Sequence, residues 1–252
     1  MIQINDLSYK IGDKKILDSV CLKIDKGITA IIGPNGSGKT TLLKAIEGLI
    51  EFKEGEVLID GEKQDKKTRK ERALMMTYFP QFRPVPQIEA ELLIEHGRFP
   101  YTGFQKKMSE KDQEAIQKAI ESTDTYALVN KKVSRLSGGE RQKIYIATAL
   151  AQDTDIILFD EPTTYLDLSY QLEVLEIIKS LKSEGKTIVV VLHDLIEAFS
   201  LSDQIVLMND GKIISIGTPE SMIVSGIIKD VFHSSLVKDD DSNSVFKYKL
   251  IK

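Results

Sequence analysis

One stretch decides the fold of this chain, Gly33-Pro34-Asn35-Gly36-Ser37-Gly38-Lys39-Thr40. It is a complete G-x-x-x-x-G-K-[ST] pattern, preceded by an apolar run at 28–32 that predicts a buried strand and followed by a predicted helix at 39–48. The glycines allow the backbone N–H groups to point inward, and the helix N-terminus adds a positive dipole end. The strand–loop–helix context therefore predicts a phosphate-binding loop rather than a glycine-rich turn with a chance lysine.

Two side chains of this loop have individual predicted roles. Lys39 is expected to reach the β- and γ-phosphates of a nucleotide, and the Thr40 hydroxyl is expected to ligate Mg²⁺. The rest of the loop, together with Thr41 that follows it, is the predicted nucleotide contact.

The composition limits the classes of protein to be considered. At 252 residues the chain is long for one domain and short for two, which fits one core domain with an inserted subdomain. Its 34 Lys and Arg against 38 Asp and Glu lack the basic bias of a broad nucleic-acid surface, so we expect no nucleic-acid partner. The single cysteine, Cys21, excludes an intrachain disulfide and a cysteine-based metal cage, and its apolar surroundings predict a small packing residue.

No part of the chain predicts membrane insertion or export. The N-terminus lacks the basic flank and apolar stretch of a signal peptide, and no run approaches 18 apolar residues. We therefore expect a cytoplasmic protein whose membrane association, if any, depends on a partner.

The remaining pattern predicts alternating strands and helices. Residues 2–10 and 16–24 alternate as half-buried strands do, with a hairpin turn at Gly12-Asp13. Prolines and two helical patterns between 82 and about 135 predict an inserted helical subdomain. The dense charge at 63–72 favours a solvated loop and helix face over a nucleic-acid contact. The other expected elements are strands 55–60, 75–79, 155–159, 187–192, 204–208 and 213–216, helices 87–96, 109–122, 139–151, 169–184 and 194–201, a short helix from Pro219, and a turn at 239–241 between two short strands.

Two acidic residues follow a buried strand. Asp160 comes directly after the apolar run 156–159, where a carboxylate can hold Mg²⁺ beside a phosphate loop. Glu161 is the candidate general base that polarises an attacking water. The alternative is a helix N-cap with a surface acid, which the presence of the phosphate loop disfavours.

Three further positions are candidates for the site. Ser137-Gly138-Gly139 before a predicted helix forms a second anion site or an ordinary N-capped helix start, and its place 23 residues before Asp160 favours the first. Gln81 follows a strand and can contact Mg²⁺ or the water through its amide. His193 follows the strand 187–192 and can bind a γ-phosphate, whereas His96 and His233 are expected to be structural.

Taken together, these motifs resemble the ATP-binding subunits of ABC transporters. The resemblance covers residues 2–236 and rests on motifs in family order: the loop 33–40, Gln81, Leu136–Gln142, Ile157–Pro162, Leu166-Asp167 and His193. It implies an α/β fold with a P-loop NTPase core, an N-terminal antiparallel β-subdomain and an inserted α-helical subdomain at about 82–138. It also implies an ATP-binding domain over 1–236 and a short extension over 237–252.

A finer resemblance concerns the importers of ferric siderophores, haem and cobalamin. It rests on Gly97–Tyr101, Glu161–Leu175, Val191–Leu195 and Ile228–Phe232. It implies an ATP-hydrolysing subunit that powers uptake of a metal chelate through a membrane permease. The alternatives are another ABC transporter, a soluble ABC ATPase that is not a transporter, and a non-hydrolytic switch, against which Glu161 argues.

The family resemblance also implies an arrangement of the site. ATP and Mg²⁺ would lie between two copies arranged head to tail, with the loop of one copy facing Ser137 and Gly139 of the other, and with Asp167 near the facing copy. The implied catalytic residues are Glu161, His193, Gln81 and Lys39, and the implied metal ligands are Thr40, Gln81 and Asp160. A permease helix would dock at 82–101, which implies a peripheral location on the inner face of the cell membrane.

The chain departs from the family at the adenine contact. Many members carry an aromatic residue just before the glycine of the first hairpin, where this chain has Ile11 ahead of Gly12. Tyr9 lies two residues earlier, on the same strand face if the strand continues. Either Tyr9 stacks on adenine or Ile11 makes an apolar contact, with about 1 kcal/mol lost if stacking is absent. A packing role for Tyr9 is equally open.

Overall fold

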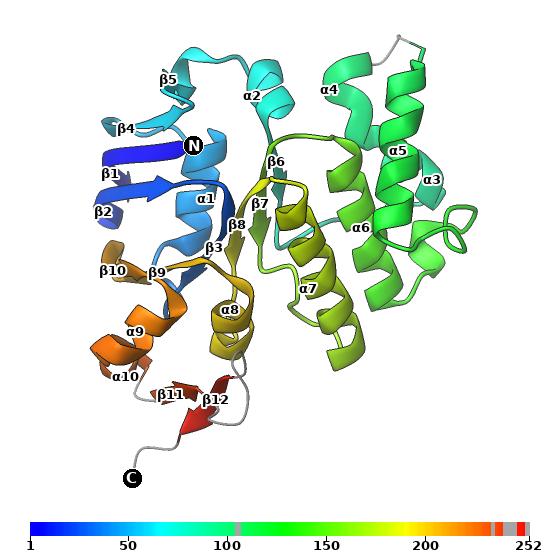
Figure 1. Cartoon of the computed structure of the whole chain (residues 1–252). Coiled ribbons are helices and arrows are strands. Elements are labelled where there is room, and N and C mark those ends of the chain that lie inside the picture. The colour runs from blue at the N-terminus through cyan, green and yellow to red at the C-terminus, as the bar shows by residue number, and fades with distance from the viewer. Residues whose placement is uncertain (104–106, 233–234, 239–245, 250–252) are drawn as a thin grey trace.

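Two sheets of different kinds lie on either side of the helix that follows the phosphate loop (Figure 1). The computed structural model describes residues 1–103, 107–232, 235–238 and 246–249. The antiparallel sheet has the order β2 (Lys14–Ile24), β1 (Ile2–Ile11), β4 (Glu54–Ile59) and β5 (Glu62–Lys63). The second sheet has the order β10 (Lys212–Gly217), β9 (Gln204–Asn209), β3 (Gly27–Ile32), β8 (Thr187–Val191), β7 (Ile156–Asp160) and β6 (Met76–Phe79). Only β10 runs antiparallel to its neighbour in the second sheet.

The helices follow the order that the sequence predicts, with additional short turns. They are α1 (Lys39–Glu47), η1 (Gln64–Lys66), α2 (Arg69–Met75), α3 (Ala90–Glu95), η2 (His96–Arg98), α4 (Phe99–Thr102), α5 (Glu110–Ser122), η3 (Val133–Arg135), α6 (Gly138–Ala151), α7 (Leu168–Ser183), α8 (Leu195–Leu201), α9 (Pro219–Ser225) and α10 (Ile227–Phe232). A small hairpin, β11 (Ser235–Lys238) and β12 (Phe246–Lys249), follows them.

The parallel strands are covered on both faces, which explains why their sequences are almost continuously apolar. Ile28 and Ile32 of β3 point to the face covered by α7, α8 and α9. Ile31 points to the opposite face, where α1 and the antiparallel sheet complete a second core. Helix α1 is thereby held between the two sheets, and the loop before it has a rigid base.

The third core belongs to the helical part on the right of Figure 1, where α3, α5 and α6 pack together. Arg98 is buried there and donates to Asp112 Oδ1 at 2.9 Å and to the Ala151 carbonyl at 2.9 Å. A Cβ on Gly97 would lie 2.2 Å from the Thr148 carbonyl, so no side chain fits. The segment 97–101, which suggested an importer, therefore packs and hydrogen-bonds against α5 and α6.

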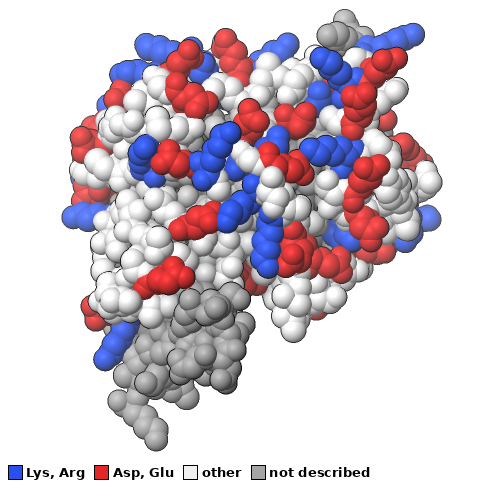
Figure 2. All heavy atoms as spheres, viewed as in Figure 1, with Lys and Arg blue, Asp and Glu red and all other residues white. Residues whose placement is uncertain are grey.

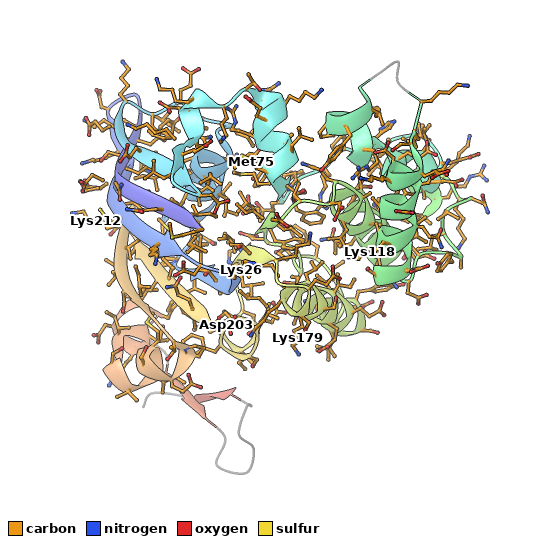
Figure 3. All side chains as sticks on the ribbon, turned by 45° about the horizontal axis from the view of Figure 1, so that its top comes forward. Lys26, Met75, Lys118, Lys179, Asp203 and Lys212 are labelled. Atoms are coloured by element: carbon orange, nitrogen blue, oxygen red, sulfur yellow. The ribbon has the colours of Figure 1, made fainter. Side chains whose placement is uncertain are left out.

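The structure confirms the expected strands and most of the expected helices, with three differences. The helix expected at 87–96 is shorter, because α3 begins only at Ala90, after the bridge that Glu89 forms with Lys132, and ends at Glu95, where a 3₁₀ turn follows. Met75 ends α2 rather than opening the strand (Figure 3). Cys21 is exposed, so the prediction of a packing residue was wrong. Its neighbours Val20 and Leu22 point into the core, and the alternation places Cys21 on the open face.

The surface charge and the length of the helices also bear on the partners of this chain. Figure 2 shows acidic and basic side chains interspersed over the visible face. No helix within the described ranges is long and apolar enough to cross a membrane. The expected turn at 239–241 and His233 lie outside the described residues.

Candidate functional site

The predicted site residues lie at one edge of the second sheet, where four adjacent parallel strands end. The strands β3, β8, β7 and β6 are neighbours in that order. The phosphate loop follows β3, His193 follows β8, Asp160 ends β7 with Glu161 directly after it, and Gln81 follows β6. Because parallel strands have their carboxyl ends at the same edge, residues from distant parts of the sequence meet there.

The loop 33–40 has the backbone conformation that an anion site needs. Gly38 is the N-cap of α1 with φ +101°, a left-handed conformation that favours glycine. A Cβ on Gly33 would lie 2.1 Å from the Met208 carbonyl. Helix α1 has no side-chain cap and no acidic residue in its first turn. Its first N–H groups and its positive dipole end are therefore available to a phosphate.

Lys39 lies inside this loop. Its buried ammonium donates to the carbonyls of Gly33 at 2.8 Å and Pro34 at 3.0 Å. Burial lowers the pKa of Lys39, and the carboxylates of Glu161 and Asp160 act in the opposite direction. A bound anion would favour the charged form further. The Ser37 hydroxyl is also buried in the loop and has no hydrogen-bond partner.

Asp160 is the buried carboxylate beside the loop, with a 1% exposed surface. Its Oδ1 accepts a hydrogen bond from the Thr40 hydroxyl at 2.9 Å, and its Oδ2 accepts one from the Tyr78 hydroxyl at 2.9 Å. Burial raises the pKa of Asp160, and these two hydrogen bonds oppose that effect. Hydroxyl and carboxylate oxygens are ligands that Mg²⁺ accepts in proteins, usually together with phosphate oxygens of the substrate. The pair Thr40 and Asp160 therefore fits Mg²⁺.

Glu161 receives donors from three segments. Its carboxylate accepts hydrogen bonds from the Gln81 amide and from the Thr164 hydroxyl at 3.2 Å, and His193 Nε2 lies 2.5 Å from Oε1. The side chain is 7% exposed, and the backbone has φ +53°. A left-handed non-glycine residue costs roughly 1–3 kcal/mol and persists only where the surrounding contacts hold it. The arrangement holds one carboxylate in a fixed position at the end of β7.

The segment 137–139 lies apart from the phosphate loop. Ser137 caps α6 by accepting from Glu140 N at 3.2 Å, and the Glu140 carboxylate accepts from Ser137 N at 2.8 Å. Helices α1 and α6 lie on opposite faces of the parallel strands (Figure 1). Within one chain this segment is a capped helix start, as the alternative interpretation expected, and its role as a second anion site stays a prediction.

The two candidates for the adenine contact differ in exposure. Tyr9 is half-buried and packs against the core between the two sheets. Ile11 exposes 61% of its surface next to the turn at Gly12. Tyr9 therefore makes packing contacts, and which of the two residues contacts adenine stays a prediction.

A groove of about 360 Å³ lies between β6 and the helical part. Prolines 84 and 86, Leu93, His96 and Tyr145 are among its lining residues. The Arg83 guanidinium stacks on the Phe79 ring at 3.4 Å and borders the groove. Much of the lining comes from the segment 82–101 that the sequence singled out.

The sequence interpretation missed two residues of the site. Thr164 donates to Glu161, and Tyr78 donates to Asp160. Thr164 lies in a motif that was recognised, so its nearness to Glu161 was available from the sequence. The Tyr78 contact depends on the pairing of β6 with β7, which no local pattern reveals.

Comparisons with known proteins agree with this geometry. The model of the family described as "ABC transporter" matches residues 17–164. The petrobactin import ATP-binding protein FpuD of Bacillus anthracis is 42% identical over 229 residues, covering 90% of this chain and 83% of that protein. The probable siderophore transport system ATP-binding protein YusV of Bacillus subtilis is 40% identical over 234 residues, covering 92% and 85%. A dimeric post-hydrolysis structure of the cassette MJ0796 with ADP and phosphate has a TM-score of 0.76 and 31% identity, covering 87% and 99%.

The fold and the site define a nucleotide-binding cassette with a phosphate loop. The chain belongs to the ABC transporter family of ATP-binding proteins, and its activity is ATP hydrolysis.

Proposed function

We propose that this chain is the ATP-hydrolysing subunit of an importer that takes up an iron–siderophore, haem or cobalamin-type chelate through a membrane permease. The observation that carries the catalytic part is the meeting of the phosphate loop, Asp160 and Glu161 at one sheet edge. The cargo class is supported by the relatives, which are named for petrobactin import and siderophore transport.

The proposed chemistry follows from the positions of the side chains. The loop N–H groups and Lys39 bind the β- and γ-phosphates, while Thr40, Gln81 and Asp160 are the residues that would hold Mg²⁺. When bound, Mg²⁺ supplies positive charge against the phosphate oxygens. Glu161 takes a proton from the water whose oxygen attacks the γ-phosphorus, and the bond from that phosphorus to the bridging oxygen of ADP breaks.

The other contacts of Glu161 have a supporting role in this proposal. Gln81, Thr164 and His193 hold the carboxylate, so that it faces the water in one orientation. His193 is 44% exposed and is also free to reach the γ-phosphate once nucleotide is bound. Neither role requires His193 to be the base.

Two copies are proposed to close the site. Residues 33–41 of one copy bind ATP, and Ser137, Gly138 and Gly139 of the partner subunit face the γ-phosphate, with Asp167 near the contact between the copies. The separation of the two segments within one chain supports this arrangement, because a single copy does not enclose the phosphate. The dimeric cassette MJ0796 with ADP and phosphate is a precedent for the dimer.

The groove is proposed to receive a cytoplasmic helix of the permease. Its apolar lining and its position beside 82–101 support that assignment. The subunit would then lie on the inner face of the membrane, with its ATP-binding domain over 1–236, the helical insertion at about 82–138, and the extension at 237–252.

The catalytic assignment is tested by Glu161→Gln. The variant is expected to lose turnover and to form an ATP-stabilised dimer, measured by phosphate release and by light scattering after size exclusion. Glu176→Gln is the control, because Glu176 is exposed on α7 and pairs with Lys179. Hydrolysis by Glu161→Gln at the parent rate would show that the base is another residue.

The cargo is tested in cells that lack the gene. Failure to grow on one defined ferric chelate, restored by the intact gene, is expected together with copurification of a permease. Normal growth of these cells on every chelate would contradict the proposed role in chelate uptake. Recruitment to membranes without any permease would favour the soluble ABC ATPase.

A further inference from the structure

We propose that Tyr78 is a positioning residue that holds the carboxylate of Asp160 in the orientation needed to bind Mg²⁺. The proposal rests on the metal role assigned to Asp160 above. Tyr78 lies 82 positions before Asp160 in the sequence and belongs to a different strand, β6.

The first support is the geometry of the carboxylate. Strand β6 pairs in parallel with β7, and Tyr78 stands opposite Leu158, two residues before Asp160. The Tyr78 hydroxyl donates to Oδ2 at 2.9 Å, while Thr40 donates to Oδ1 at 2.9 Å. One donor on each oxygen fixes the rotation of the carboxylate about its last torsion, which is otherwise broad. Asp160 is 1% exposed, so solvent offers little replacement for either donor.

The second support is that the two donors are not equivalent. A hydroxyl oxygen that ligates Mg²⁺ directs a lone pair at the metal, so in the proposed site Thr40 serves the metal as well as Asp160. Among the described contacts, the Tyr78 hydroxyl bonds to Asp160 and has no role as a metal ligand. Its hydrogen bond is therefore the one that orients Asp160 whether or not metal is present. Partners of metal ligands act in this way in other sites.

The third support is that Tyr78 is itself held in place. The ring is half-buried and packs against the core between the two sheets. A tyrosine hydroxyl is ordinarily protonated at neutral pH, so it can donate to the Asp160 carboxylate.

The test is Tyr78→Phe, which removes only the hydroxyl oxygen. Mn²⁺ affinity of the ADP-bound protein is measured by electron paramagnetic resonance, and a loss of about 10-fold is expected. The Mg²⁺ concentration for half-maximal ATPase activity is expected to rise by a similar factor, while KM for ATP at saturating Mg²⁺ changes by less than about 2-fold. Tyr126→Phe is the matched control, because the Tyr126 hydroxyl also donates to a carboxylate, Glu121 at 2.9 Å, on the exposed surface.

A third variant, Asp160→Asn, separates this inference from the proposed function. If Asp160→Asn binds Mn²⁺ as the parent does, the metal role of Asp160 is wrong. If Asp160→Asn loses Mn²⁺ affinity and Tyr78→Phe does not, the metal role stands and the positioning role of Tyr78 is overturned. An equal loss in Tyr126→Phe would also overturn it, since that hydroxyl lies outside the site.

Discussion

Glu47 ends helix α1 and is held in an unfavourable environment for a charge. Its Oε2 is buried and has no hydrogen-bond partner. It also lies at the C-terminal end of the helix dipole, which disfavours an anion. Burial raises the pKa of Glu47 to about 7, against the opposing effect of Arg72 and Arg69. Glu47→Gln keeps the shape of the side chain and removes its ability to ionise.

The magnitude follows from the two pKa values. A carboxyl that ionises near 4.5 when unfolded and near 7 when folded destabilises the folded protein by about 3 kcal/mol at high pH. The folded state binds more protons between these values, so stability falls as pH rises from about 4.5 to about 7. Glu47→Gln avoids this loss. It is expected to be more stable than the parent by about 3 kcal/mol at pH 8 and by under about 1 kcal/mol at pH 5.

The assay is urea unfolding of both proteins at the two pH values. The expected signature is a gain that grows with pH. Glu51→Gln is the control, because Glu51 is exposed four residues further on and a surface change of this kind stays within about 0.5 kcal/mol. An equal gain at pH 5 and pH 8, or no gain at pH 8, would refute the argument from burial.

Three other substitutions test contacts of the site and of the helical part. Lys39→Ala is expected to remove most of the ATP affinity, and unchanged binding in calorimetry would contradict the phosphate-loop assignment. Gly139→Ala would place a Cβ 2.3 Å from the Tyr170 ring, so a loss of roughly 1–3 kcal/mol in urea unfolding is expected. Adding Tyr170→Ala should recover part of that loss, and no recovery would exclude the ring as its cause. Asp112→Asn leaves Arg98 buried without its carboxylate, for an expected loss of roughly 3–5 kcal/mol, and a normal melting temperature would show that the pair is dispensable.

Much of the candidate site was predictable because its signals are local. The glycines of 33–40 indicate the backbone conformation of a few residues, and the apolar run before Asp160 indicates a strand that ends there. Both patterns act over fewer than ten residues, a range over which composition and periodicity are informative. Most of the strand and helix assignments were confirmed for the same reason.

The errors arose where an alternating pattern was interpreted without its neighbours. Cys21 stands among apolar residues, but the pleat turns it away from the core that Val20 and Leu22 fill. Met75 is apolar and precedes a strand, but the capping box at Thr68 starts a helix that runs through it.

By itself, the sequence determined the phosphate loop, the acidic pair Asp160 and Glu161 where a buried strand ends, and the order of strands and helices, because short-range sterics and hydrophobic periodicity specify these features. The tertiary structure alone decided which strands are neighbours. It thereby placed the Tyr78 hydroxyl on Asp160, Gln81 and His193 on Glu161, and the end of α1 in a buried setting around Glu47. The physical reason is that strand order follows from burying both faces of one sheet, which depends on the whole chain at once.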